Sequence, residues 1–133
     1  MTFSNHRRVE ICSKDAPAPV GSYSQAVLYG SVLYISGQIS IDPKTGQLIE
    51  GTFSDRVKRV MDNLKAIAVE AGTDLSQAIS VSVFLTDINQ FSEFNSIYET
   101  YFSAPYPARA LVQVAALPKG VDVEVSAQVA IPA

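Results

Sequence analysis

The sequence contains one cysteine, Cys12, and one histidine, His6, among 133 residues. With a single cysteine the chain can form neither an internal disulfide nor a cysteine-rich metal site. A Ser-His-Asp or Cys-His relay would need the one histidine, and a zinc site made of several histidines is impossible within one chain. No GxGxxG or Walker-type glycine loop is present. We therefore expect no metal and no cofactor, with any chemistry carried by Arg, Glu, Asp, Tyr, Ser, Asn and backbone groups.

Charge is also scarce. Charged residues make up 17% of the chain, the net charge is −3 and the isoelectric point is about 5.0. A small domain with so few charges is expected to hide part of its surface in an oligomer. The acidic balance argues against nucleic acid and anionic membranes as partners.

Long apolar runs are missing as well. Every uncharged stretch is interrupted before the roughly 20 apolar residues of a transmembrane helix, and no apolar segment of a secretory signal follows the basic pair Arg7-Arg8. We expect a cytoplasmic protein, and a mitochondrial location stays open.

What is present predicts a single α+β domain over residues 1–133, with 1–8 as a flexible start. Periodicity and turn residues predict strands at 9–12, 23–29, 31–39, 79–85, 106–114 and 121–129, and helices at 53–71 and 90–102. Thr52 and Asp55 resemble a capping box at the start of the first helix. This order favours a mixed sheet with both helices on one face and the other face bare.

The last two predicted strands alternate apolar and polar residues. In the final strand the apolar set is Val121, Val123, Val125, Ala127 and Val129. If the two strands pair as a β-hairpin with matched apolar faces, Arg109 shares a face with Glu124. With Gln113 opposite Glu124, the two charges lie roughly 13 Å apart along the strands. Either the register differs, or one site combines groups from neighbouring chains. Such a mixed face suggests a subunit interface or a site for a carboxylate ligand.

Several short blocks in order and spacing resemble one known family. They are Ala16-Pro17-Ala18-Pro19-Val20-Gly21-Ser22-Tyr23-Ser24-Gln25-Ala26, Ser36-Gly37-Gln38, Asp42-Pro43-Lys44-Thr45-Gly46, Asp62-Asn63-Leu64, Phe94-Asn95-Ser96-Ile97-Tyr98, Pro107-Ala108-Arg109 and Val123-Glu124-Val125. Together they span about residues 10–130, and the chain is similar to the reactive-intermediate deaminase (RidA, formerly YjgF) family. The resemblance implies a chorismate-mutase-like α+β domain in a homotrimer, with a central barrel and a ligand site at each subunit interface.

The resemblance also implies an activity without metal or cofactor. Similar proteins hydrolyse enamine and imine acids such as 2-aminoacrylate to a 2-keto acid and ammonia. These intermediates leak from pyridoxal-phosphate enzymes such as serine/threonine dehydratases, which gives the protein a functional link to them.

Two charged residues carry the predicted chemistry. Arg109 is expected to bind the substrate carboxylate, because guanidinium stays charged and fits a carboxylate with two parallel hydrogen bonds; an interface salt bridge is the structural alternative. Glu124 is expected to position or deprotonate water or to hold the substrate nitrogen; the alternative is an ordinary strand carboxylate.

Other positions complete the predicted site. Tyr23 matches the family's active-site tyrosine, or is a half-buried aromatic; Ser36 and Gly37 bring backbone groups close to a ligand. Asn95 either helps to bind substrate or caps backbone groups, with the second slightly favoured. Leu111 stands where many members have cysteine, which makes the pocket floor more apolar.

A further departure from the family is Arg56, which replaces a glutamine often found early in the first helix. We leave its effect open. Two alternative functions also stay open: a non-catalytic trimeric sensor of 2-keto acids, and, less favoured because no basic stripe with stacking aromatics is present, an endoribonuclease or translation inhibitor.

Overall fold

The computed structural model describes residues 7–132, so most of the predicted flexible start lies outside the described residues. Its elements are β1 (Val9–Ile11), β2 (Ala26–Tyr29), β3 (Val32–Gln38), α1 (Phe53–Glu70), β4 (Ala78–Leu85), α2 (Phe91–Tyr98), β5 (Ala108–Gln113) and β6 (Val123–Ala130), with 3-10 turns η2 (Leu75–Gln77), η3 (Ile88–Gln90), η4 (Glu99–Tyr101) and η5 (Pro118–Gly120). The predicted helices are confirmed, except that the second one ends early and continues as η4.

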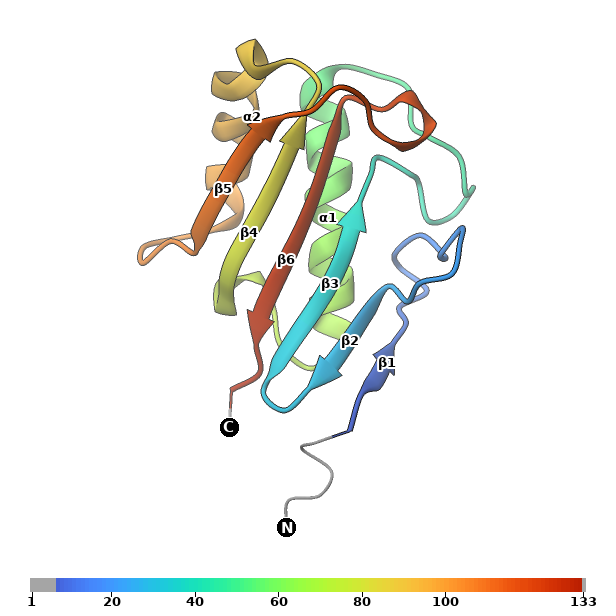
Figure 1. The fold of residues 1–133 in the computed structure, drawn as a ribbon, viewed down its shortest axis with the longest axis vertical. Helices are drawn as coiled ribbons and strands as arrows, with labels where there is room; N and C mark the ends of the chain where they lie inside the picture. The colour runs from blue at the N-terminus through green and yellow to red at the C-terminus, as the bar shows by residue number, and fades with distance from the viewer. Residues whose placement is uncertain (1–6, 133) are drawn as a thin grey trace.

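The six strands form one mixed sheet in the order β1-β2-β3-β6-β4-β5 (Figure 1). All neighbours are antiparallel except β4 and β5, which are parallel. The predicted hairpin of the last two strands is therefore wrong. Strand β6 inserts between β3 and β4, while β5 pairs with the far side of β4 after the chain has crossed over through α2. Alternation identifies the faces of a strand but not its neighbours, which is why the pairing was missed.

The strand register also changes the predicted face of Arg109. It lies opposite Val81, which in turn lies opposite the buried Ala127, so Arg109 is on the core face of the sheet. Glu124 lies opposite Phe84, on the other face. The prediction that both charges share one face is thus wrong within a single chain.

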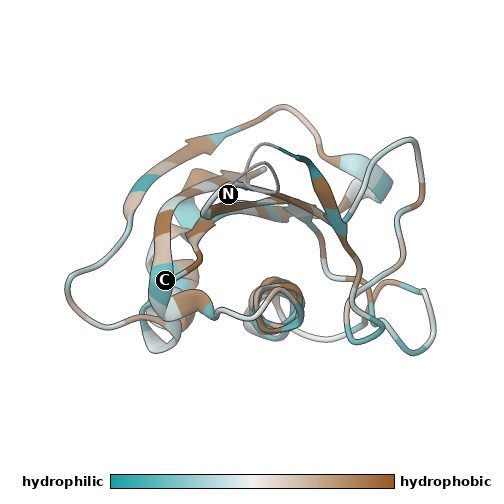
Figure 2. Ribbon diagram, turned by 90° about the horizontal axis from the view of Figure 1, so that it is seen from below, coloured by the Kyte–Doolittle hydropathy of each residue, from teal (hydrophilic) through white to brown (hydrophobic). Residues whose placement is uncertain are grey.

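Both helices lie on one face of the sheet, as predicted, and Figure 2 shows the sheet curving over α1. Thr52 and Asp55 form the predicted capping box, in which each side chain accepts from the other residue's backbone N–H. Helix α1 then buries one stripe against the sheet: Phe53, Val57, Val60, Met61, Asn63, Leu64, Ile67 and Ala68. The stripe and the apolar positions of β3, β4 and β6 form the core.

No helix of the described part of the chain covers the opposite face of the sheet. Tyr29, Tyr34 and Val112 expose 43–47% of their surface there, beside polar positions of β4 and β6. Exposed apolar side chains in such a group are typical of a protein interface. Among residues 7–132, no helix is both long and apolar enough to cross a membrane.

Candidate active site

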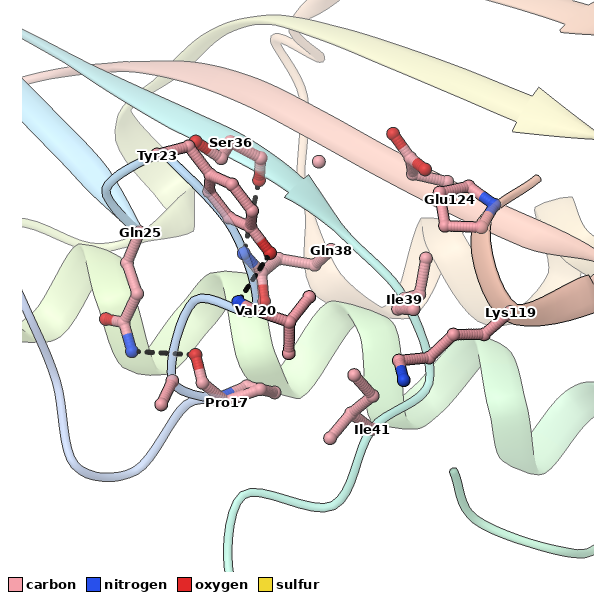
Figure 3. A pocket seen from close by; sticks show the side chains of 13 residues that line it. Pro17, Val20, Tyr23, Gln25, Ser36, Gln38, Ile39, Ile41, Lys119 and Glu124 are labelled. Carbon is pink, nitrogen blue, oxygen red and sulfur yellow. Dashed lines mark hydrogen bonds between the residues drawn. The ribbon is translucent and has the colours of Figure 1, made fainter. Parts of the chain in front are cut away.

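A pocket of about 320 Å³ opens at the end of β3, within the size range of small-molecule sites. Its lining residues come from four segments, as Figure 3 shows: Pro17, Ala18, Val20, Tyr23 and Gln25 before β3; Ser36, Gly37, Gln38, Ile39 and Ile41 in and after β3; Pro118 and Lys119 in η5; and Glu124 in β6. We call it the Glu124 pocket. It brings together four of the predicted site residues: Tyr23, Ser36, Gly37 and Glu124.

A bulge in β3 shapes this pocket. The β3–β6 register shifts between Ile35 and Gln38, so that two residues of β3 face one residue of β6. Bulges redirect side chains and are frequent beside functional sites. Gly37 lies in the bulge, and a Cβ atom there would come within 2.8 Å of the carboxyl carbon of Glu124. Glycine at this position therefore lets the Glu124 carboxylate lie against the backbone of β3.

The Glu124 side chain is only partly accessible, and burial raises the pKa of its carboxyl above the ordinary value. Within the described chain no hydrogen bond or ion pair engages this carboxylate. An accessible carboxylate with a raised pKa and no protein partner is suited to accept a proton from water or to bind a cationic nitrogen.

Tyr23 and Ser36 take different parts in the pocket. The Tyr23 hydroxyl accepts a 3.3 Å hydrogen bond from the Val20 N–H, and its side chain remains 48% exposed at the rim. The Ser36 hydroxyl instead donates to the Ser24 carbonyl at 2.7 Å, so it joins the β3 bulge to the segment that precedes β2. Tyr23 can reach a ligand with its oxygen, whereas the Ser36 hydroxyl already has a structural partner.

Gln25 has a structural role in this site that was not predicted from the sequence. Gln25 is 1% exposed; its side-chain oxygen accepts from the Ser13 N–H at 2.7 Å, and its amide donates to the carbonyls of Ser13 and Pro17, both at 2.9 Å. This neutral side chain fixes the loop that forms one wall of the pocket. The sequence signal was an amide side chain directly before the apolar residues of β2.

Asn63 has a similar function on the other side of β3 and was also missed. It is fully buried, and its amide donates to the carbonyls of Ile39 and Ile41 at 3.2 and 3.0 Å. The segment after β3, which contributes both isoleucines to the pocket, is thereby tied to α1. A polar residue within the apolar stripe of a helix was the signal, because buried amides need partners.

Arg109 lies in a second hollow, between β5 and α2, which we call the Arg109 hollow. Its guanidinium donates to the Asn95 side-chain oxygen at 2.8 Å, and its Cζ atom lies 4.8 Å from the centre of the Tyr98 ring. Tyr106 and Pro107 line the same hollow. Asn95 therefore positions Arg109 in this chain and is not bonded to a nearby loop backbone.

The predicted site residues thus fall into two groups in one chain. Leu111 belongs to neither; it packs, half-buried, against the core and does not line the Glu124 pocket. Arg109 and Glu124 are two strands and three residues apart in register, which places their backbones roughly 14 Å from each other on opposite faces.

Arg56, the departure from the family pattern, has a clear structural partner. Its Nε and Nη2 atoms donate to the two carboxylate oxygens of Asp122 at 3.0 and 2.7 Å, and Nη1 donates to the Gly51 carbonyl. Asp122 precedes β6 by one residue. This bidentate pair ties the first turn of α1 to the beginning of the strand that carries Glu124.

A metal centre has no visible basis in the portion of the chain that the structure covers. No group of three or more His, Cys, Asp and Glu side chains in residues 7–132 is arranged to hold an ion. Fold and pocket together define an α+β domain with a pocket of small-molecule size at one end of its sheet.

Comparison with known proteins assigns this domain to a family. The model of the family described as Endoribonuclease L-PSP matches residues 13–131. The 2-iminobutanoate/2-iminopropanoate deaminase of Rattus norvegicus is 47% identical over 120 residues, which are 90% of this chain and 88% of that protein.

Solved structures agree with this assignment. RidA from the Antarctic bacterium Psychrobacter sp. PAMC 21119 has 47% identity and a TM-score of 0.90, covering 93% of this chain and 100% of its own. TdcF of E. coli with bound serine has 36% identity and a TM-score of 0.88, covering 93% and 99%. The chain belongs to the Endoribonuclease L-PSP family, which confirms the resemblance to RidA/YjgF proteins.

Proposed function

We propose that this protein is a hydrolytic deaminase of enamine and imine acids, such as 2-aminoacrylate and 2-iminopropionate, and releases a 2-keto acid and ammonia. The observation that carries the proposal is the Glu124 carboxylate, which lies over Gly37 in a pocket of about 320 Å³ and has no partner among the described residues. The names of the mammalian relatives, which are 46–47% identical, support the same reaction.

The proposed active form is a homotrimer with sites shared between chains. Arg109 and Glu124 lie on opposite sheet faces, so a single chain cannot present both to an acid of three or four carbons. A neighbouring chain that packs on the bare sheet face can bring its own Arg109 to the Glu124 pocket. The exposure of Tyr34 and Val112, 45% and 47% in the single chain, supports association through this face.

In the proposed mechanism, Arg109 of one chain binds the substrate carboxylate in the Glu124 pocket of the next. Glu124 accepts a proton as water adds to the C=N carbon, while the C=N π electrons move to the nitrogen, which takes a proton from solvent. Protonated Glu124 then gives its proton to the carbinolamine nitrogen and ammonia leaves. The hydroxyl proton passes to solvent as the C=O bond of the keto acid forms, so that Glu124 is again a carboxylate. Tyr23, whose oxygen is at the rim, hydrogen-bonds the substrate or the water.

Positioning and general acid–base assistance are sufficient for this reaction, because imines also hydrolyse unaided. The serine bound to TdcF shows that a relative takes up a small amino acid. In the cell, the proposed substrates arise from pyridoxal-phosphate-dependent dehydratases, and we place the protein beside them in the cytoplasm.

The test is a coupled assay. A dehydratase generates 2-aminoacrylate from serine, and keto-acid release is followed with and without this protein. Faster release that is lost in Arg109→Ala, with the assembly still folded, is the expected result. Full activity in that variant would overturn the role of Arg109.

Two further measurements, of pyruvate binding and of nuclease activity, distinguish the other candidate functions. Saturable binding of pyruvate without faster release would identify a sensor of keto acids. A nuclease activity that stays with the purified protein and disappears in Glu124→Gln would identify a ribonuclease.

A further inference from the structure

The Glu124 pocket contains two formal charges, and they are not paired with each other. Of its lining residues, Lys119 is the one cation and Glu124 the one anion. Arg56–Asp122 is the sole ion pair within residues 7–132, so no carboxylate of this part of the chain lies within 4 Å of the Lys119 ammonium. An uncommitted cation and an uncommitted anion therefore line the same small cavity.

The backbone of Lys119 is unusual. Its φ of 58° and ψ of 17° place it in the left-handed region, where residues other than glycine, asparagine and aspartate are uncommon. The turn is held by hydrogen bonds from the Gly120 N–H to the Leu117 carbonyl and from the Val121 N–H to the Pro118 carbonyl. Glycine would fit this position without strain. A lysine kept in a strained conformation beside a pocket points to a use for its side chain.

The side chain extends into the cavity. Figure 3 shows it reaching from η5 toward Ile41, with its nitrogen end beside the apolar wall that Ile39 and Ile41 form. A lysine stem can lie on apolar side chains while its ammonium stays hydrated. The nitrogen thus lies on the Ile39–Ile41 side of the pocket, and the Glu124 carboxylate lies on the β6 side.

We infer that Lys119 is a substrate-positioning residue that attracts the carboxylate of the incoming acid to the Glu124 pocket and holds it there. This inference rests on the proposed function and adds a second cation, from the same chain as Glu124, to the Arg109 of the neighbour. A protonated imino acid carries a negative carboxylate and a positive nitrogen, which match Lys119 and Glu124 respectively. An exposed ammonium acts mainly on capture of the acid, because charges near a pocket raise association rates.

Three variants test this role. Lys119→Met removes the charge and keeps the stem, Lys119→Arg keeps the charge, and Lys119→Gly removes both charge and backbone strain. We expect KM to rise about fivefold in the Met and Gly variants with kcat within about twofold of wild type, since exposed ionic contacts are individually weak. The Arg variant should retain a KM near that of wild type. Lys44→Met, in the surface turn outside the pocket, is the matched control and should change neither value.

Two readouts separate this role from a structural one. The salt dependence of kcat/KM should weaken in Lys119→Met, because screening acts on the missing charge. Lys119→Gly should melt at no lower temperature than wild type while still showing the raised KM. Loss of kcat with unchanged KM, or a normal KM in both uncharged variants, would overturn the inference.

Equilibrium binding of pyruvate distinguishes failure of this inference from failure of the proposed function. If the wild-type protein binds pyruvate without accelerating imine hydrolysis, the deaminase proposal fails. Weaker pyruvate binding by Lys119→Met than by wild type would then still support the role of Lys119 in binding the carboxylate. Equal binding of pyruvate by wild type and Lys119→Met, or no binding by either, would overturn the role of Lys119.

Discussion

The Glu124 pocket and the Arg109 hollow contain opposite charges in opposite circumstances. The Glu124 carboxylate is partly buried and has no protein partner among the described residues, whereas the Arg109 guanidinium is exposed, bonded to Asn95 and stacked on Tyr98. The Glu124 carboxylate is available to a ligand, and the Arg109 guanidinium is held in position. A carboxylate-bearing imine would need both: a cation for its carboxylate and a base for the water that attacks it.

The difference lies in how the two regions are built. The Arg109 hollow is formed by neighbouring parts of the chain, since α2 is followed by η4 and then by β5. The Glu124 pocket combines segments distant in sequence, which Gln25 and Asn63 fasten through buried hydrogen bonds. The Glu124 pocket supplies an anion without a partner in residues 7–132, and the Arg109 hollow supplies an exposed, separately positioned cation. A site shared between copies would need both.

The largest effect is expected from Glu124→Gln, which removes the proton acceptor and nearly preserves shape. Activity should fall about 10²- to 10³-fold, as expected for loss of a general base. Ser126→Ala, two residues further along the same strand face, should remain close to wild type. The coupled keto-acid assay measures both, and an undiminished rate in Glu124→Gln would remove the chemical significance of the unpaired carboxylate.

Mixing two inactive variants tests whether the two regions meet across chains. Arg109→Ala and Glu124→Gln chains are refolded together in equal amounts. With random assembly, about one interface in four combines an intact Glu124 with an intact Arg109, so about a quarter of wild-type activity should return. Each variant refolded alone is the control. No recovery in well-assembled mixtures would mean that the two residues do not share a site between chains.

A smaller effect is expected from Gly37→Ala. The new methyl group would overlap the Glu124 carboxyl group, and because that group ends a flexible side chain, the carboxylate should move and the fold should survive. We expect about a tenfold loss of kcat/KM, since small displacements of reacting groups are costly. Circular dichroism and melting temperature check the fold. Wild-type activity in Gly37→Ala would show that the position of Glu124 against β3 is unimportant.

The smallest effect concerns stability. The pKa of Glu124 is raised in the folded chain, so the folded state binds a proton more tightly than the unfolded state. That stabilising contribution is complete below the unfolded pKa and is lost as the pH rises through the folded pKa. Glu124→Gln should therefore be more stable than wild type at about pH 7. The difference in the free energy of unfolding between the two proteins should narrow toward about pH 4.

Urea denaturation at the two pH values measures this difference. Glu50→Gln, a change at an exposed carboxylate, should show no such pattern. A Glu124→Gln variant that is less stable than wild type near neutral pH would contradict the account of an unpaired, partly desolvated carboxylate.

Local features of the fold were predictable because their causes are local. The capping pair Thr52 and Asp55 and the apolar stripe that follows identified α1, and strict alternation identified the buried face of β6 correctly. Strand pairing was not predictable, because the apolar and polar pattern of a strand does not identify the strands that lie beside it. In β5 the choice of face was also wrong: Val112 is 47% exposed, while Leu111 packs on the core.

The same distinction applies to the site. Family motifs pointed to Tyr23, Gly37 and Glu124, which the structure places around one pocket. Arg109 was assigned to the wrong face because the alternation of apolar and polar residues predicts a charged side chain on the face without helices. Its guanidinium lies instead on the helix side, where it contacts Asn95 and the Tyr98 ring. Buried amides such as Gln25 were overlooked because their partners are backbone carbonyls, which no sequence pattern displays.

The sheet order has a consequence for biosynthesis. Strand β6 follows the other five strands along the chain but lies between β3 and β4. Until it leaves the ribosome, the nascent chain can form only two separate half-sheets, β1-β2-β3 and β4-β5, with a vacancy for one strand between them. Pairings between distant segments form slowly and leave strand edges open to other chains. Each newly made molecule therefore passes through a stage in which the edges of β3 and β4 are unpaired. Both edges become paired only when β6, the strand that bears the proposed base, is inserted between them.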